Sequence, residues 1–300
     1  MKMNNKDAFC ACHPAVIFLY FLLVLFFSMF FMHPVCLAVS LVSAISYNIL
    51  LKGSRALKTG FAVILPMMLL AVTVNFAFNH EGSTILAYFS TGNPLTLESI
   101  LYGTAAGVML ASVITWFSCL NEVMTSDKLM YLFGRIVPSL SLIISMVLRF
   151  IPKFSEQFRA VSRAQRCMGN EVSKRGPFSK IKSAVSITSV VITWSLENAI
   201  ETSDSMKSRG YGLGGRTSFS YYRFGARDRS ILLWLLFCGI YIAFGWFTGS
   251  LDFRYYPTLK GSPFSGYFIS LSAVYLLMSM TPLILSIMEA RKWKHLQSEI

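Results

Sequence analysis

The sequence predicts an all-α integral membrane protein with about six transmembrane helices and a cytoplasmic module of long helices. Hydrophobic residues make up 54% of the 300-residue chain and charged residues only 14%, against roughly 25% charged residues in soluble domains. Long apolar runs recur, and 25 of the 27 Lys and Arg residues lie on one side of the membrane that these runs define. Because cytoplasmic loops are enriched in Lys and Arg, this side is the inner one.

Four apolar runs in residues 1–120 predict an N-terminal membrane domain, since a span needs about 20 mostly apolar residues. The runs are 14–32, 35–51, 61–78 and 99–120. The first two meet at His33-Pro34, a basic loop over 52–58 precedes the third, and a polar loop precedes the fourth. In that polar loop, Asn93 before Pro94 is typical of a helix N-cap followed by proline at the first helical position.

Two further apolar runs, 231–248 and 264–288, predict a C-terminal membrane domain over residues 230–300 with a basic tail, Arg291-Lys292-Trp293-Lys294. Only Arg254 and Lys260 are basic residues of the predicted outer loops. Six spans with this charge distribution place both termini in the cytoplasm.

Residues 121–229 hold 17 Lys and Arg residues and form the predicted cytoplasmic module. If its two apolar stretches, 137–148 and 184–200, both crossed the membrane, nine basic residues between them would lie outside, against the charge bias. We expect helices at or just under the inner membrane face, packed on each other and on the spans. Pro138 and Pro152 are expected to punctuate the first one.

Residues 153–169 and 180–209 predict two long helices in this module. The first has an apolar stripe beside a basic stripe of Arg159, Arg163 and Arg166. The second has an acidic stripe of Glu197, Glu201 and Asp204, and Gly210 ends it. The two charged stripes either pair in part, for example Arg163 with Glu201, or both stay solvated, because exposed pairs contribute only ~0–1 kcal/mol.

The predicted spans contain no Asp, Glu, Lys or Arg between their ends. Such groups mark proton relays and ion pathways, so a transporter or channel that works alone is disfavoured. The chain also lacks the P-loop motif G-x-x-x-x-G-K-[ST], and its glycine-rich run at 210–215 does not replace that motif because the run follows a helix and not a strand. An ATPase that drives transport would therefore be another chain.

Other chemistry is also disfavoured. Cys10-Ala11-Cys12-His13 has soft-metal ligands but no second ligand pair, so no metal site is predicted. His80 is predicted outside and the acidic stripe inside, so no catalytic constellation forms. No nucleic-acid partner is expected, because no aromatic-basic reading surface is present.

Arg209 lies at the predicted C-terminus of the second long helix, where the helix dipole favours a cation by ~0.3–1 kcal/mol. This is a sufficient structural reason for the residue. The small neighbours Ser208 and Gly210 also leave its guanidinium accessible for a bidentate pair with a carboxylate of a partner.

Several motifs together resemble a known family. Ser205-Met206-Lys207-Ser208-Arg209-Gly210-Tyr211-Gly212 resembles the second Ala-Arg-Gly-type motif of EcfT/CbiQ-like proteins, the transmembrane T components of energy-coupling factor (ECF) transporters. Ala164-Gln165-Arg166-Cys167-Met168-Gly169 resembles the first, although Met168 stands where the family has arginine. The segments Arg149-Phe150-Ile151-Pro152, His13-Pro14, His33-Pro34 and Asn93-Pro94-Leu95 also fit.

The resemblance implies a bacterial plasma-membrane scaffold with no catalytic residue, metal or cofactor of its own, in which residues 121–229 form a module of coupling helices. Two cytoplasmic ABC ATPase subunits, A and A′, would bind ATP-Mg, and a small membrane S component would bind a vitamin or metal. The residues implied to contact the ATPases are Arg166, Cys167, Met168 and Gly169 of the first motif and Ser208, Arg209 and Gly210 of the second. The alternatives are a dedicated cobalt or nickel transporter subunit, or a membrane anchor or enzyme unrelated to transport.

Overall fold

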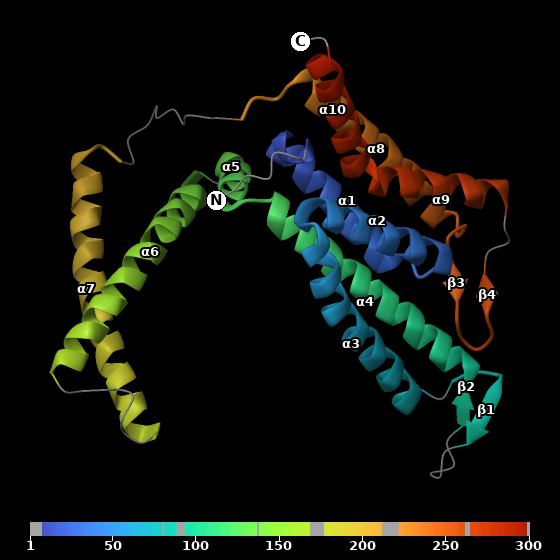
Figure 1. The fold of residues 1–300 in the computed structure, drawn as a ribbon, viewed down its shortest axis with the longest axis horizontal. Helices are drawn as coiled ribbons and strands as arrows, with labels where there is room; N and C mark the ends of the chain where they lie inside the picture. The colour runs from blue at the N-terminus through green and yellow to red at the C-terminus, as the bar shows by residue number, and fades with distance from the viewer. Residues whose placement is uncertain are drawn as a thin grey trace. The chain divides into compact units, whose positions relative to one another are not determined.

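The computed structural model describes residues 8–79, 81–88, 94–136, 138–168, 177–211, 222–261 and 265–298, and these are largely helical (Figure 1). The chain divides into two compact units. Residues 1–129 with 222–300 form the first, called here the membrane unit, and residues 130–221 form the second, called the hairpin unit. The division into residues 1–120, 121–229 and 230–300, which rests on the predicted membrane spans and the charge distribution, stays a prediction.

Helices dominate the membrane unit. They are η1 (Phe9–Ala11), α1 (Pro14–Phe30), α2 (Pro34–Lys52), α3 (Ser54–Phe78), α4 (Leu97–Val123), α8 (Ala226–Phe247), α9 (Gly266–Ser279) and α10 (Thr281–Ser298). Two short antiparallel pairs of strands lie in the loops, β1 (Ile85–Tyr88) with β2 (Pro94–Thr96) and β3 (Phe253–Arg254) with β4 (Lys260–Gly261). Helix α5 (Ser126–Ile136) leads into the hairpin unit, which contains α6 (Pro138–Cys167) and α7 (Pro177–Ser208).

Among the described residues, α2, α4 and α8 are long and apolar enough to cross a membrane, which confirms the all-α integral membrane class. Helix α1 has 17 residues, or about 26 Å at 1.5 Å per residue, against ~30 Å of hydrocarbon. The apolar part of α3, Ile64–Asn75, is also short. The predicted number of six spans therefore stays a prediction.

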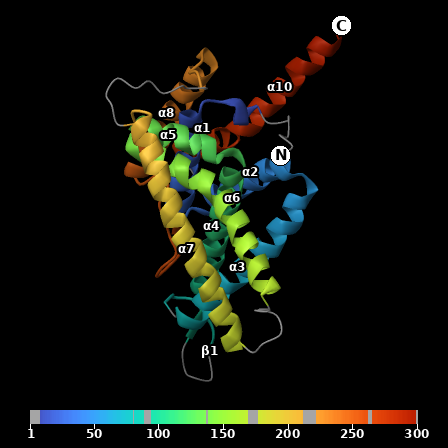
Figure 2. The ribbon, with the colours of Figure 1, turned by 90° about the vertical axis from the view of Figure 1, so that its left-hand side faces the viewer.

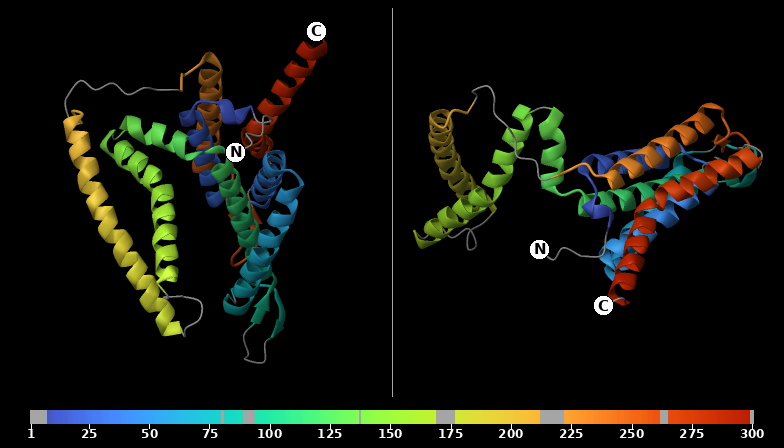
Figure 3. Two further views of the ribbon diagram at one scale, coloured as in Figure 1. Left: turned by 60° about the vertical axis from the view of Figure 1, so that its left-hand side comes forward. Right: turned by 90° about the horizontal axis from the view of Figure 1, so that it is seen from above.

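The apolar run at 264–288, expected as one span, is two helices. Helices α9 and α10 meet at Met280 with a bend of 56° (Figure 3). Pro282 follows at once, and proline is tolerated in the first turn of a helix but not in its interior. The two helices together form at most one bent span.

The core of the membrane unit contains a buried polar network. Helix α4 packs against α1, α2 and α3. The hydroxyl of Ser28 in α1 lies 2.9 Å from those of Ser40 in α2 and Ser112 in α4, and Trp116 Nε1 donates to Ser40 at 3.2 Å. All four side chains are buried. Because such polar residues hydrogen-bond across helices in lipid, they tie three helices together.

Helices α3 and α4 approach closely at two glycines one turn apart. A Cβ atom added to Gly103 would lie 3.1 Å from Val72 Cα, and one added to Gly107 would lie 3.1 Å from Met68 Cα. This small-xxx-small spacing is typical of closely packed membrane helices.

Two predicted helix starts were wrong. Residues 52–58 are not a loop, because the chain turns at Gly53 alone (φ 66°) and α3 begins at Ser54. The N-cap predicted at Asn93 lies outside the described residues, and Pro94 belongs to β2. Thr96 caps α4 instead by accepting the Ser99 N–H. Strand pairing holds the chain extended up to Thr96, which delays the helix.

The main helices of the hairpin unit are α6 and α7, which run antiparallel and cross (Figures 1 and 2). The expected separation of 137–148 from 153–169 was wrong, since α6 continues through Pro152. Proline inside a helix costs about 3 kcal/mol because an i−4 carbonyl loses its partner. Here Pro152 lies on an exposed face, where water can hydrate that carbonyl. The rings of Phe150 and Phe154, two residues before and two residues after Pro152, stack on each other with centroids 5.8 Å apart.

Candidate functional site

The two helices of the hairpin unit are held together where they cross. The Trp194 ring of α7 packs edge-on against Phe154 of α6, with centroids 5.9 Å apart. Lys153 Nζ donates to Asn198 Oδ1 at 2.7 Å and lies 5.3 Å from the Trp194 ring and 5.9 Å from the Phe150 ring. These contacts fix the register of α6 on α7.

This register contradicts the predicted pairing of Arg163 with Glu201. Because Lys153 meets Asn198 in an antiparallel pair, Arg163 lies on one side of the crossing and Glu201 on the other. Arg163 is ten residues from Lys153, about 15 Å along the helix. The structure shows no ion pair between the basic and acidic stripes in the described residues. The complementary charges of the basic and acidic stripes did not predict the register of α6 on α7, because the packing of Phe154 against Trp194 sets it.

The first motif lies at the C-terminal end of α6. Arg166, Cys167 and Met168 are all exposed there, and the exposed fraction of Met168 is 66%. Gly169 lies outside the described residues. The motif therefore presents a cation beside an apolar side chain, both open to a partner.

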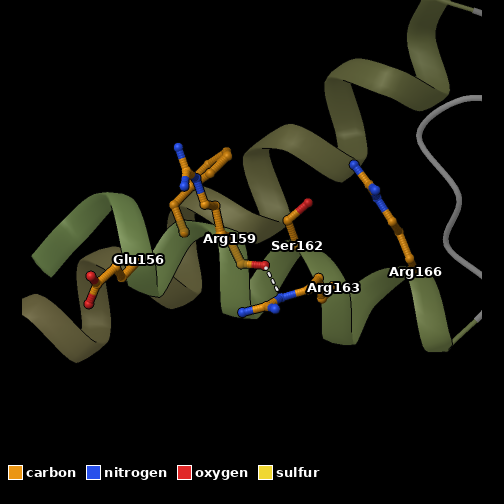
Figure 4. A pocket seen from close by; sticks show the side chains of 6 residues that line it. Glu156, Arg159, Ser162, Arg163 and Arg166 are labelled. Carbon is orange, nitrogen blue, oxygen red and sulfur yellow. Dashed lines mark hydrogen bonds between the residues drawn. The ribbon is translucent and has the colours of Figure 1, made fainter. Parts of the chain in front are cut away.

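A basic concavity of 480 Å³ adjoins this helix end (Figure 4). Its described lining is Glu156, Phe158, Arg159, Ser162, Arg163 and Arg166. Arg163 Nε donates to the backbone oxygen of Arg159 at 3.3 Å. The three arginines of the predicted basic stripe thus line one concavity, together with a single acidic residue, Glu156.

The second motif lies at the C-terminal end of α7, and glycine builds its shape. Gly210 has φ 73°, its N–H donates to Lys207 O at 3.0 Å, and the Tyr211 N–H donates to Met206 O at 3.1 Å. These two bonds define a Schellman cap, in which a left-handed glycine ends the helix. The prediction that Gly210 stops this helix is confirmed.

Arg209 is the last residue before that glycine, and it is exposed. The structure shows no ion pair of Arg209 within the described residues, whereas its neighbour Lys207 lies 3.8 Å from Asp204. Arg209 therefore offers an uncompensated cation at the negative end of the α7 dipole.

Arg166 and Arg209 are not brought together. Helix α7 has 32 residues, about 48 Å at 1.5 Å per residue. The first motif lies near the start of α7 along the chain and the second at its end. Each motif is thus a separate exposed helix C-terminus, at opposite ends of one antiparallel pair (Figure 1).

Comparison with known proteins gives the family. The family described as CbiQ, cobalt transport protein, matches residues 11–221. This is more than half of the chain and includes both motifs, so the chain belongs to the CbiQ family. The resemblance to EcfT/CbiQ-like transmembrane T components is confirmed.

Curated relatives agree with this family. The energy-coupling factor transporter transmembrane protein EcfT of Bacillus selenitireducens is 30% identical over 156 residues, 48% of this chain and 58% of that protein. EcfT of Lactobacillus helveticus is 31% identical over 152 residues, covering 50% and 52%. EcfT 1 of Listeria monocytogenes is 28% identical over 200 residues, covering 61% and 73%. The chain spans little more than half the length of the first two relatives.

Proposed function

We propose that this chain is the T component of an ECF-type importer in a bacterial plasma membrane. It couples ATP hydrolysis by two cytoplasmic ATPases, A and A′, to reorientation of a small membrane S component that binds a vitamin. ATP-Mg binds to the ATPases and not to this chain. Both termini lie in the cytoplasm.

The main support is the pair of exposed helix ends. Two ATPases need two docking points, and the hairpin unit has one arginine-containing helix C-terminus at each end. A guanidinium forms a bidentate pair with a carboxylate, so each end suits an acidic groove on one ATPase. At the first end, the exposed Met168 adds an apolar contact beside Arg166.

Charge reversal at the second helix end tests this proposal. Arg209→Glu should abolish co-purification of one ATPase and ATP-dependent uptake, because it places two carboxylates opposite each other. Lys207→Glu is the matched control, since it reverses an exposed charge two residues away that faces Asp204. Equal loss in both variants, or full uptake with Arg209→Glu, would refute the docking role and favour a membrane anchor.

The alternative cargo is cobalt, which the description of the family names, or nickel. Affinity purification in mild detergent with mass spectrometry would identify the S component that accompanies the chain. Uptake of labelled vitamins and of labelled Co²⁺ and Ni²⁺ by the purified complex would then separate the two cargoes.

A further inference from the structure

Most of the segment of residues 8–13 is buried although it precedes the first apolar helix. Phe9 is 0% exposed and Cys12 1%. The Phe9 ring packs edge-on against Tyr20 and Phe21 of α1, at 5.1 and 6.5 Å. The segment is therefore folded against α1.

Residues 8–13 bind the part of the chain that leads into the hairpin unit. Lys128, near the start of α5, is only 7% exposed. Its ammonium group donates to Cys10 O at 2.8 Å and to Val123 O at 2.9 Å. A buried charge is unfavourable unless it is hydrogen-bonded, so Lys128 joins the end of α4 to the segment. We call residues 123–128 the leading root.

The same segment binds the part of the chain that returns from the hairpin unit, residues 224–228, which we call the returning root. Asp228 Oδ1 accepts the His13 N–H at 2.9 Å, and its Oδ2 accepts the Gly225 N–H at 3.0 Å. The Phe224 ring packs edge-on against the His13 ring at 5.2 Å.

Arg227 adds a third link at the returning root. Its guanidinium donates to Ala8 O at 3.1 Å and to Cys12 Sγ at 3.4 Å. It also pairs with Glu289 of α10 at 3.3 Å. The returning root is thereby fixed both to residues 8–13 and to α10.

We propose that residues 8–13 are a clamp that holds the two roots of the hairpin unit at a fixed separation, with Lys128 and Asp228 as its positioning residues. Six residues span at most about 20 Å, so the clamp keeps the C-terminal end of α4 close to the N-terminal end of α8. A displacement that reaches either root then moves both helices together. This consequence for transport rests on the proposed function, whereas the clamp itself does not.

Hydrogen exchange of the full chain in detergent tests the clamp directly. Lys128→Met should speed amide exchange several-fold at residues 8–13 and, through the clamp, also at the returning root. Lys52→Met is the matched control, because Lys52 ends α2 and donates to Ser118 at 2.6 Å, away from the clamp. Unchanged exchange at the returning root in Lys128→Met would overturn the proposal.

Transport measurements test the consequence. In the complex with its ATPases, Lys128→Met and the milder Asp228→Asn should keep assembly and ATP hydrolysis but move less substrate per ATP, and Lys128→Arg should restore that ratio. Parallel loss of assembly, thermal stability and uptake would overturn the coupling role and leave a structural one. If no ATPases co-purify with the unaltered chain, the proposed function is refuted, whereas the hydrogen-exchange test of the clamp remains valid.

Discussion

At the residue scale, Gly210 has a conformation that other residues resist. Its φ of 73° lies in the left-handed region, which costs a residue with Cβ about 1–2 kcal/mol. Gly210→Ala should therefore lower the stability of the last turn of α7 by about that amount and speed amide exchange at residues 206–211.

The control for Gly210→Ala is the same substitution at Gly60, inside α3. A Cβ at Gly60 would meet only the flexible end of Ile64, at 3.8 Å. There alanine should stabilise the helix by about 0.5–1 kcal/mol. Equal effects at the two sites would contradict the assignment of the cap.

His33 is a second residue whose surroundings set its behaviour. It is 4% exposed, its Nδ1 accepts the Val35 N–H at 3.3 Å, and its ring contacts Phe268 at 4.5 Å. Burial lowers the pKa of His33 from its ordinary value of 6.5. At pH values between the lowered pKa of His33 in the folded chain and its ordinary pKa in the unfolded chain, the unfolded chain binds a proton that the folded chain does not.

The thermal stability of the chain should therefore fall as the pH drops below about 6.5. His33→Asn should flatten this dependence, because asparagine caps a helix without titrating in this range. The same pH slope in His33→Asn and the unaltered chain would exclude His33 as the cause.

At the element scale, the crossing of α6 and α7 depends on Lys153 and Trp194. A double-mutant cycle of Lys153→Met and Trp194→Leu should give a coupling free energy of about 0.5–1 kcal/mol, as for an exposed cation–π pair. The comparison cycle is Arg163→Met with Glu201→Gln, which should give a value near zero. Coupling in the second cycle and none in the first would mean that the register is wrong.

The positions of helices along the chain were predicted from the sequence better than the contacts between helices and loops. The end of α7 at Gly210 was predictable because a left-handed glycine is a local signal. The start of α4 was not, because it depends on contacts across the loop. Glu98 accepts the Thr84 N–H and the Ser83 hydroxyl, and Thr96 donates to Glu81 O. Such pairings join residues whose proximity exists only in the folded chain.

The candidate site shows the same division. The exposed Arg209 and its glycine cap were predictable from eight consecutive residues. The positions of Lys153 and Asn198 were not, since each looks like an ordinary surface residue. Their contact depends on the register that Phe154 and Trp194 set across the hairpin.

At the scale of the whole molecule, the basic residues predict the orientation in the membrane. Cys167 is exposed in the hairpin unit, on the predicted inner side. A membrane-impermeant thiol reagent should not label it in intact cells and should label it in inverted vesicles. Leu259→Cys, at a 44% exposed position between β3 and β4, should show the opposite pattern. Reversed labelling of the two sites would contradict the predicted topology.

The position of the crossing within the hairpin also has a mechanical meaning. Arg166 is twelve residues beyond Phe154 along α6, and Arg209 is fifteen beyond Trp194 along α7, or about 18 and 22 Å at 1.5 Å per residue. The two helix segments beyond the crossing, called here the arms, are thus of similar length. In the proposed coupling, a rotation of the helices about the crossing would displace both tips by similar distances. Seven residues inserted in one arm would add about 10 Å and break that balance.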